Sequence, residues 1–267
     1  LDEFMEVVAK TNAAGMRVAA GLLGEDVLDR EAATAVARDY ERILDRFAAA
    51  GARANVALKL THLGLGIDRD LAAANLASVV RHAAGLRNFV RIDMEQSART
   101  EATLAIYREL RSKGLDNVGT VLQAYLRRSQ ADLESLLALA PNLRLVKGAY
   151  LEPASIAYPD KRDVDRSYVK LIETSLLRGG FTAIATHDDA VIDHCGEFIR
   201  ARSIEQGAYE FQMLYGVRPR LQADLIRRGH PLRIAVPFGS QWYPYFMRRL
   251  AERPANVTFF FASMLRG

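Results

Sequence analysis

Short apolar runs alternate with amphipathic segments along almost the whole chain. Each run has the length of a buried strand, and each intervening segment repeats its apolar residues at helical spacing. Strands are predicted to begin near residues 16, 54, 89, 118, 143, 181, 209 and 232. Helices are predicted at 2–14, 29–50, 68–84, 100–113, 130–139, 165–178, 190–205 and 218–228. Strict alternation of strand and helix indicates an α/β fold with a parallel sheet.

The number of these units favours a closed barrel over an open sheet. Eight strand–helix units in 267 residues match a (β/α)8 barrel. An open doubly wound sheet that binds a dinucleotide would normally carry a glycine-rich first turn, and no Gly-x-Gly-x-x-Gly occurs. No linker rich in proline, glycine or serine divides the chain. We therefore expect one catalytic barrel domain over residues 1–267, with the helix at 2–14 preceding the first strand.

Residues 241–254 are predicted to form the C-terminal eighth helix, which would lie over the active site. Prolines near both ends suit its first turn and its end. Arg248 and Glu252 are four residues apart and share a face, and Arg249 is adjacent. Neighbouring arginines beside aromatic residues fit a small carboxylate substrate, because a guanidinium group can bind a carboxylate bidentately. The alternative is an amphipathic helix whose charges face water.

Composition limits the possible classes of protein. Half of the residues are hydrophobic and a quarter are charged, as in soluble globular proteins, and no apolar run is long enough to span a membrane. Cys195 is the only cysteine, so no internal disulfide can form, and a reducing, cytoplasmic location is expected. The formal charge of +4 includes no block of like charges, so no nucleic-acid partner is expected.

Polar residues recur where the predicted strands end. Active sites of such barrels lie at the carboxyl ends of the strands. Polar side chains within apolar strands cost several kcal/mol if they are left unpaired. Some of these residues could instead form polar layers inside the barrel. The polar residues are Lys59, Asp93, Glu95, Gln123, Arg144, Lys147, Thr186, His187, Glu210 and Gln212.

The same segments resemble the proline dehydrogenase family, which are flavin-dependent (β/α)8 barrels that oxidise L-proline. The match covers nearly the whole chain in the family's order. It is carried by residues 91–95, 144–150, 210–216 and 245–252, with support from 123–125 and 185–188.

The resemblance implies a substrate pocket built from strand ends and the last helix. Two arginines would hold the substrate carboxylate, two charged residues would pair with them, and two further residues would pack on the pyrrolidine ring. The implied substrate-binding residues are Arg248 and Arg249 for the carboxylate, Lys59 and Glu252 for the ion pairs, and Tyr150 and Leu214 for the ring.

The resemblance also implies non-covalently bound FAD and no metal. Asp93, pairing with Lys59, would orient the substrate, and Arg144 would lie near the reactive flavin nitrogen; these two are the expected catalytic residues. The residues implied to line FAD are Met94, Gln123, Arg144, Lys147, Gly148, Ala149, Thr186 and His187.

The implied reaction is oxidation of L-proline to 1-pyrroline-5-carboxylate, the first step of proline catabolism. Electrons would pass to a quinone through peripheral contact with the inner face of a membrane. A pyrroline-5-carboxylate dehydrogenase would be the downstream partner.

Two positions depart from the family's pattern. Relatives commonly carry a tyrosine where this chain has Ala235, and many carry an acidic residue where it has Gly21. The first departure leaves open an amine oxidation that tolerates hydroxyproline, and the second leaves open a missing ion pair over the substrate.

The residues also allow three other interpretations. A lysine Schiff-base lyase could use Lys59 or Lys147 as its nucleophile. A metal-dependent hydrolase could use residues 186–189, but the histidines lack His-x-His or His-Glu-x-x-His spacing. A basic, non-enzymatic binding protein would need an exposed stripe of positive charge, whereas the arginines are scattered.

Overall fold

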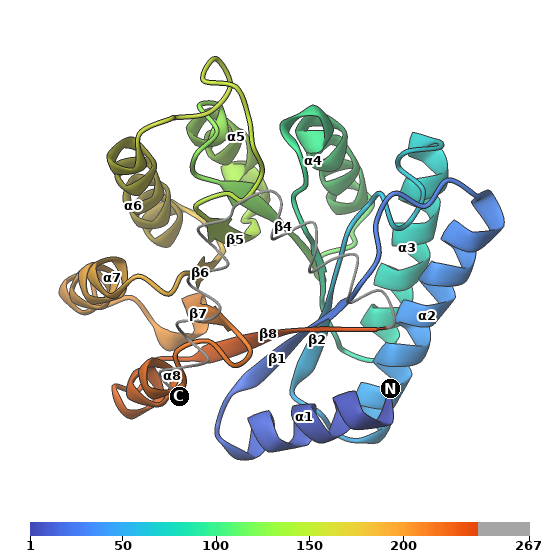
Figure 1. Cartoon of the computed structure of the whole chain (residues 1–267), viewed down its shortest axis with the longest axis horizontal. Helices are drawn as coiled ribbons and strands as arrows, with labels where there is room; N and C mark the ends of the chain where they lie inside the picture. Colours follow the sequence, from blue (N-terminus) through green and yellow to red (C-terminus); the bar gives the residue numbers. More distant parts are fainter. Residues whose placement is uncertain (240–267) are drawn as a thin grey trace.

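The computed structural model describes residues 1–239, in which eight parallel strands close into a barrel inside a ring of helices (Figure 1). Each strand pairs with its neighbour in the chain, and β1 pairs with β8 to close the sheet. The predicted barrel is therefore confirmed. The strands are β1 Arg17–Leu22, β2 Ala54–Leu58, β3 Val90–Ile92, β4 Val118–Gln123, β5 Asn142–Val146, β6 Phe181–Ala185, β7 Tyr209–Leu214 and β8 Leu232–Phe238.

The helices begin and end within a few residues of their predicted bounds. The predicted helix before the first strand is present as α1. The largest differences are of four residues: α7 ends four residues early, and α6 begins four residues early. The early start of α6 follows because the Asp160 carboxylate accepts a hydrogen bond from the backbone N–H of Arg162 at 2.8 Å. The helices are α1 Asp2–Ala13, α2 Arg30–Ala49, α3 Arg69–Gly85, α4 Ser97–Ser112, α5 Ser129–Leu136, α6 Lys161–Arg178, α7 Asp189–Ala201 and α8 Pro219–Arg227.

The predicted helix at 241–254 lies outside the described residues. The same holds for three of the implied substrate-binding residues, Arg248, Arg249 and Glu252.

The main core lies between the barrel wall and the helices. Successive strand residues point to opposite faces of a sheet. In β5, Leu143 and Leu145 are fully buried in this core, while Asn142 and Arg144 alternate with them. Each buried leucine contributes about 1.5–3 kcal/mol, so the apolar positions hold the wall to the helices. The alternate positions leave polar side chains facing the barrel axis.

Gly119 in β4 makes room for one of these polar side chains. A Cβ at this position would lie 2.5 Å from Arg91 Nη1, and closer still to the backbone oxygen of Asn142. We expect Gly119→Ala to lower the free energy of unfolding by about 2–3 kcal/mol through this overlap. Urea denaturation measures the change.

Gly85→Ala is the matched control, because no described atom lies within 4 Å of a Cβ added at the end of α3. Equal stability of the two variants would show that the space beside Arg91 is not constrained.

Candidate active site

The two expected catalytic residues meet at the carboxyl ends of the strands. Asp93 follows β3, and Arg144 lies in β5. Arg144 Nη1 donates a hydrogen bond to Asp93 Oδ1 at 2.6 Å, and Arg144 Nε donates to Gln212 Oε1 at 2.7 Å. The Arg144 side chain is only 11% exposed, so two oriented acceptors fix the direction of its charge.

The contacts of Arg144 continue down the inside of the barrel. Gln212 Nε2 donates to Glu210 Oε1 at 2.7 Å, and Arg233 Nε donates to the same oxygen at 2.6 Å. Burial alone would raise the pKa of Glu210, but Arg233 and the hydrogen bonds outweigh it and lower that pKa. The carboxylate is therefore charged at neutral pH. A line of hydrogen bonds joins Asp93, Arg144, Gln212, Glu210 and Arg233 through the barrel interior.

Sequence reasoning placed Glu210 and Gln212 at a strand end but did not foresee this line. Arg233 was missed as well. The available signal was the alternation of polar residues within β7 and β8, which puts Glu210, Gln212 and Arg233 on the inner face.

Lys59, an implied substrate-binding residue, forms an ion pair with Glu25 from the loop between β1 and α2. Both side chains are mostly buried, at 17% and 16% exposure. Sequence reasoning missed Glu25, although its place just after the first strand was a usable signal. The structure gives Asp93 a cationic partner in Arg144, while the expected pair between Asp93 and Lys59 stays a prediction.

Lys147 lies between two aspartates, and the sequence did not predict either as its partner, although Asp188 belongs to the segment 186–189 weighed for a metal site. Its Nζ is 2.5 Å from Asp165 Oδ1 and 2.8 Å from Asp188 Oδ2. Burial lowers the pKa of Lys147, but the hydrogen bonds to both carboxylates outweigh it and raise that pKa overall. Lys147 therefore stays protonated at neutral pH, which does not suit a Schiff-base nucleophile.

Thr186 and His187 follow β6 and offer hydrogen-bond donors. His187 Nε2 accepts a hydrogen bond at 3.0 Å from the backbone N–H of Leu214, which is an implied substrate-binding residue. Burial, with the nearby charge of Arg218, lowers the pKa of His187 to about 4. The ring is therefore neutral, and this contact leaves the proton on Nδ1. Thr186 Oγ1 accepts from the backbone N–H of Asp188 at 3.1 Å, which leaves its hydroxyl hydrogen to donate.

The remaining implied FAD-lining residues lie at the ends of β3, β4 and β5. Gln123 Nε2 donates to the backbone oxygen of Met94 at 3.4 Å, and within the described residues Gln123 Oε1 is buried without a partner. Gly148 has φ +115°, and a Cβ there would overlap the Tyr125 ring. Glycine is therefore required where the chain turns toward Ala149 and Tyr150, which are both half-buried.

A closed (β/α)8 barrel with ordered arginine, lysine and histidine side chains at the carboxyl ends of its strands has the architecture of a barrel enzyme. A family model described as proline dehydrogenase matches residues 4–261. The chain therefore belongs to the proline dehydrogenase family, so it is an oxidoreductase of a flavoprotein family.

Individual relatives agree with the family match. The chain is 42% identical to "Proline dehydrogenase 2" of Bacillus subtilis over 259 residues, covering 97% of this chain and 85% of the relative. It is 43% identical to "Proline dehydrogenase" of Deinococcus radiodurans over 250 residues, covering 92% and 81%.

A solved structure shows the same fold. This is proline utilization A from Bdellovibrio bacteriovorus inactivated by N-propargylglycine, with a TM-score of 0.86, 26% identity and 93% of this chain covered. This chain spans about a third of that protein, 31% of its length.

The lowered pKa values of His62, which is buried, and His187, which is half-buried, predict that the fold loses stability in mild acid. Burial, with the charge of Lys59, lowers the pKa of His62 to about 4, as burial and Arg218 do for His187. Both histidines bind a proton at higher pH in the unfolded state than in the folded state. Their contribution to the free energy of unfolding is therefore present above about pH 6.5 and is lost as the pH falls toward 4. We expect each histidine to lower the free energy of unfolding by about 2 kcal/mol when the pH falls from 8 to 5, and urea unfolding measures this change.

His62→Gln should show a shallower loss of stability over the same range. His194→Gln, at an exposed histidine, is the matched control. A slope in His62→Gln that equals the wild-type slope would contradict the prediction.

Proposed function

We propose that the protein oxidises L-proline to 1-pyrroline-5-carboxylate with non-covalently bound FAD as the hydride acceptor, as a dehydrogenase of proline catabolism. Family membership supports the reaction class. The observation that carries the assignment to this site is the Arg144 side chain, held by Asp93 and Gln212 at the catalytic end of the barrel.

The donors present fit a cofactor with a pyrophosphate and a flavin ring. Lys147 supplies a fixed positive charge, and Thr186 and His187 supply neutral donors that suit phosphate oxygens. Gln123 Oε1, buried and unpartnered within the described residues, offers an acceptor. Met94, Gly148 and Ala149 complete the proposed lining.

The remaining roles follow from charge. Arg144 would stabilise the negative charge that develops on the acceptor, because its orientation is set before the reaction begins. A substrate pocket in which Arg248 and Arg249 add positive charge to that of Lys59 would favour the neutral form of the substrate amine, which hydride release requires. Asp93 would orient the substrate. The remaining proposed substrate contacts are Tyr150 and Leu214 on the ring, and Arg248, Arg249 and Glu252 at the carboxylate.

The electron acceptor and the partners are also part of the proposal. In the part of the chain that the structure describes, no helix has the length and apolar character needed to cross a bilayer. We propose that electrons reach a quinone through peripheral membrane contact. A pyrroline-5-carboxylate dehydrogenase would take the product, and residues 1–267 would act as one catalytic domain.

A visible absorption spectrum of the purified protein tests the proposal directly. We expect flavin bands that bleach when L-proline is added without oxygen. Flavin bands that ignore proline would contradict the substrate assignment. A colourless protein that cannot be reconstituted with FAD would contradict the cofactor assignment, and borohydride trapping of a carbonyl substrate would then favour the lyase.

Ala235 provides a test of substrate choice. It lies in β8, in register with Leu214 of β7, which is a proposed ring contact. We expect Ala235→Tyr to raise the preference for L-proline over trans-4-hydroxy-L-proline by about tenfold or more in kcat/KM, because the larger side chain would occupy the space of the substrate hydroxyl.

Ala235→Phe is the matched control, since it adds the ring without the phenol oxygen and separates volume from hydrogen bonding. An unchanged ratio of kcat/KM in Ala235→Tyr would show that this position does not contact the substrate ring.

A further inference from the structure

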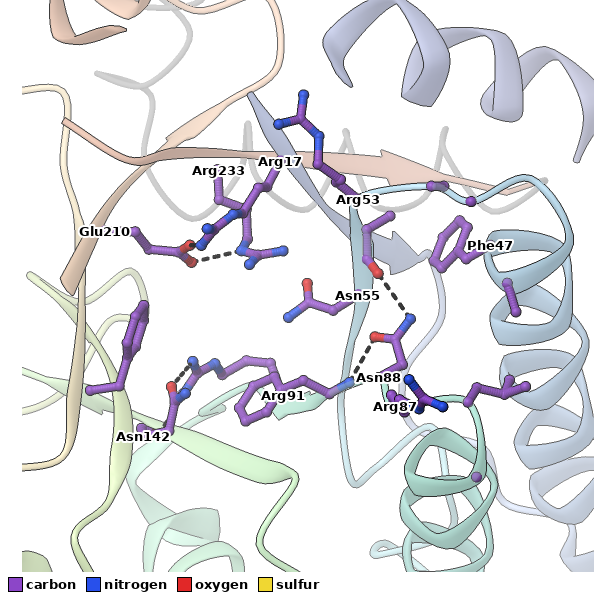
Figure 2. Close-up of a pocket in the computed structure, with 18 residues that line it drawn as sticks. Arg17, Phe47, Arg53, Asn55, Arg87, Asn88, Arg91, Asn142, Glu210 and Arg233 are labelled. Carbon is purple, nitrogen blue, oxygen red and sulfur yellow. Dashed lines mark hydrogen bonds and ion pairs between the residues drawn. The ribbon is translucent and has the colours of Figure 1, made fainter. Parts of the chain in front are cut away.

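A cavity of about 690 Å³ opens at the end of the barrel opposite the candidate active site (Figure 2). Its lining includes the first or second residue of most strands, such as Arg17 of β1, Asn55 of β2 and Glu210 of β7. This face of a (β/α)8 barrel normally serves stability. A cavity of this volume is within the range of small-molecule sites.

The described lining of this cavity is strongly cationic. Among the lining residues that the structure describes, Glu210 is the only acidic one. Against that one carboxylate stand five arginines, an excess of four positive charges. The arginines are Arg17, Arg53, Arg87, Arg91 and Arg233.

Glu210 is already occupied by two of these arginines. Arg233 Nε donates to Glu210 Oε1 at 2.6 Å, and Arg17 Nη1 donates to Oε2 at 3.4 Å. The carboxylate also accepts from Gln212. Glu210 therefore has little capacity left to neutralise the other arginines.

Arg91 is buried among neutral partners. It is 2% exposed, and Nη1 donates to the backbone oxygens of Thr120 and Asn142 at 2.9 and 2.7 Å. Nη2 donates to the side-chain oxygen of Asn142. Burial, with the charges of Arg144 and Arg233, lowers the pKa of Arg91 to about 9, so it remains protonated at neutral pH. These hydrogen bonds hold the guanidinium in place but supply no negative charge.

Two buried polar atoms at this cavity lack partners among the described residues. They are Arg91 Nε and Asn55 Oδ1, and the Asn55 residue is 7% exposed. Figure 2 shows the Asn55 side chain pointing into the space between the Glu210–Arg233 pair and Arg91. Leaving such groups unpaired costs about 1–3 kcal/mol each, so native structures rarely do so without a ligand or water. The side-chain amide of Asn55 can also turn to donate to an anion.

A purely structural role explains only part of this arrangement. Arg91 and Arg233 join strand ends through backbone oxygens and Glu210. Arg17 and Arg87 are exposed at the mouth and add charge of the same sign. Clustered like charges destabilise a fold unless a counter-charge is present.

We propose that this cavity is a binding site for a small multivalent oxyanion, a molecule that carries phosphate or carboxylate groups. Arg91, Arg233 and Asn55 form its floor, and Arg17 and Arg87 stand at its mouth. Guanidinium groups bind both kinds of oxyanion bidentately, so they account for the shared chemistry. The site is separate from the proposed FAD and proline contacts, so its test does not depend on the enzymatic reaction.

Thermal unfolding of the purified protein with sodium pyrophosphate or sodium citrate tests the site, with sodium chloride added to keep ionic strength constant. We expect at least one probe to raise Tm by roughly 2–6 °C at millimolar concentration. The preferred probe identifies phosphate or carboxylate as the better ligand. Isothermal titration calorimetry should give one site per chain. No Tm rise and no heat with either probe would overturn the proposal.

Asn55→Asp is the decisive variant, because it places a carboxylate of nearly the same shape among the arginines. We expect it to raise Tm without a probe and to abolish the probe-dependent rise. Arg220→Ala, which removes an exposed arginine from α8 outside the cavity, is the matched control and should keep the full rise. Equal rises in wild type and Asn55→Asp would show a general salt effect and overturn the proposal.

Arg17→Ala keeps the test informative if Asn55→Asp does not fold. Its side chain is about half exposed, and Glu210 retains Arg233 when it is removed. We expect probe affinity to fall about tenfold, as for loss of one hydrogen bond to a charged group. Unchanged affinity in Arg17→Ala would overturn the proposed position of the anion.

Discussion

The partly buried hydrogen bonds of Arg144 connect the two ends of this barrel. Arg144 lies where apolar strands would normally meet, and its charge is tolerated because Asp93 and Gln212 accept from it. Removing either acceptor would leave the mostly buried guanidinium of Arg144 with one hydrogen-bond partner fewer, which destabilises the folded state. Through Gln212, the same line reaches Glu210 and Arg233 at the opposite end. Polar contacts therefore stabilise the interior of the barrel, while apolar contacts pack its strands against the surrounding helices.

The catalytic end shows how the positions of charged side chains are set by their neighbours. Lys147 lies between Asp165 and Asp188, and Lys59 pairs with Glu25 from the preceding loop. These carboxylates come from loops and helices that follow different strands, so they fix the lysines to the frame. Such outer contacts matter because a site holds its ligand only when its own side chains are already oriented.

The two ends of the barrel differ in how far carboxylates neutralise their cationic side chains. At the catalytic end, the cations at Lys59, Lys147 and Arg144 each have a carboxylate partner within the described residues. At the other end, five arginines line a cavity in which Glu210 is the only acidic residue among the described lining, and Asn55 faces the cavity with an oxygen that has no partner among the described residues. The first arrangement orients charge for chemistry. The arginines at the other end leave an excess of positive charge in the cavity, and this excess is the physical reason to expect an anion there.

The local sequence determined the barrel, because apolar residues recur with different periods in strands and in helices, and the strand–helix unit repeats eight times. It also placed Asp93, Gln123, Arg144, Lys147 and His187 at one end, since all parallel strands end on the same side. Only the tertiary structure decided which charges pair. Glu25 with Lys59, and Gln212 with Glu210 and Arg144, depend on strand register and loop paths, which a linear pattern does not encode. The arginine cavity was likewise invisible, because its residues are scattered along the chain and converge only when the barrel closes.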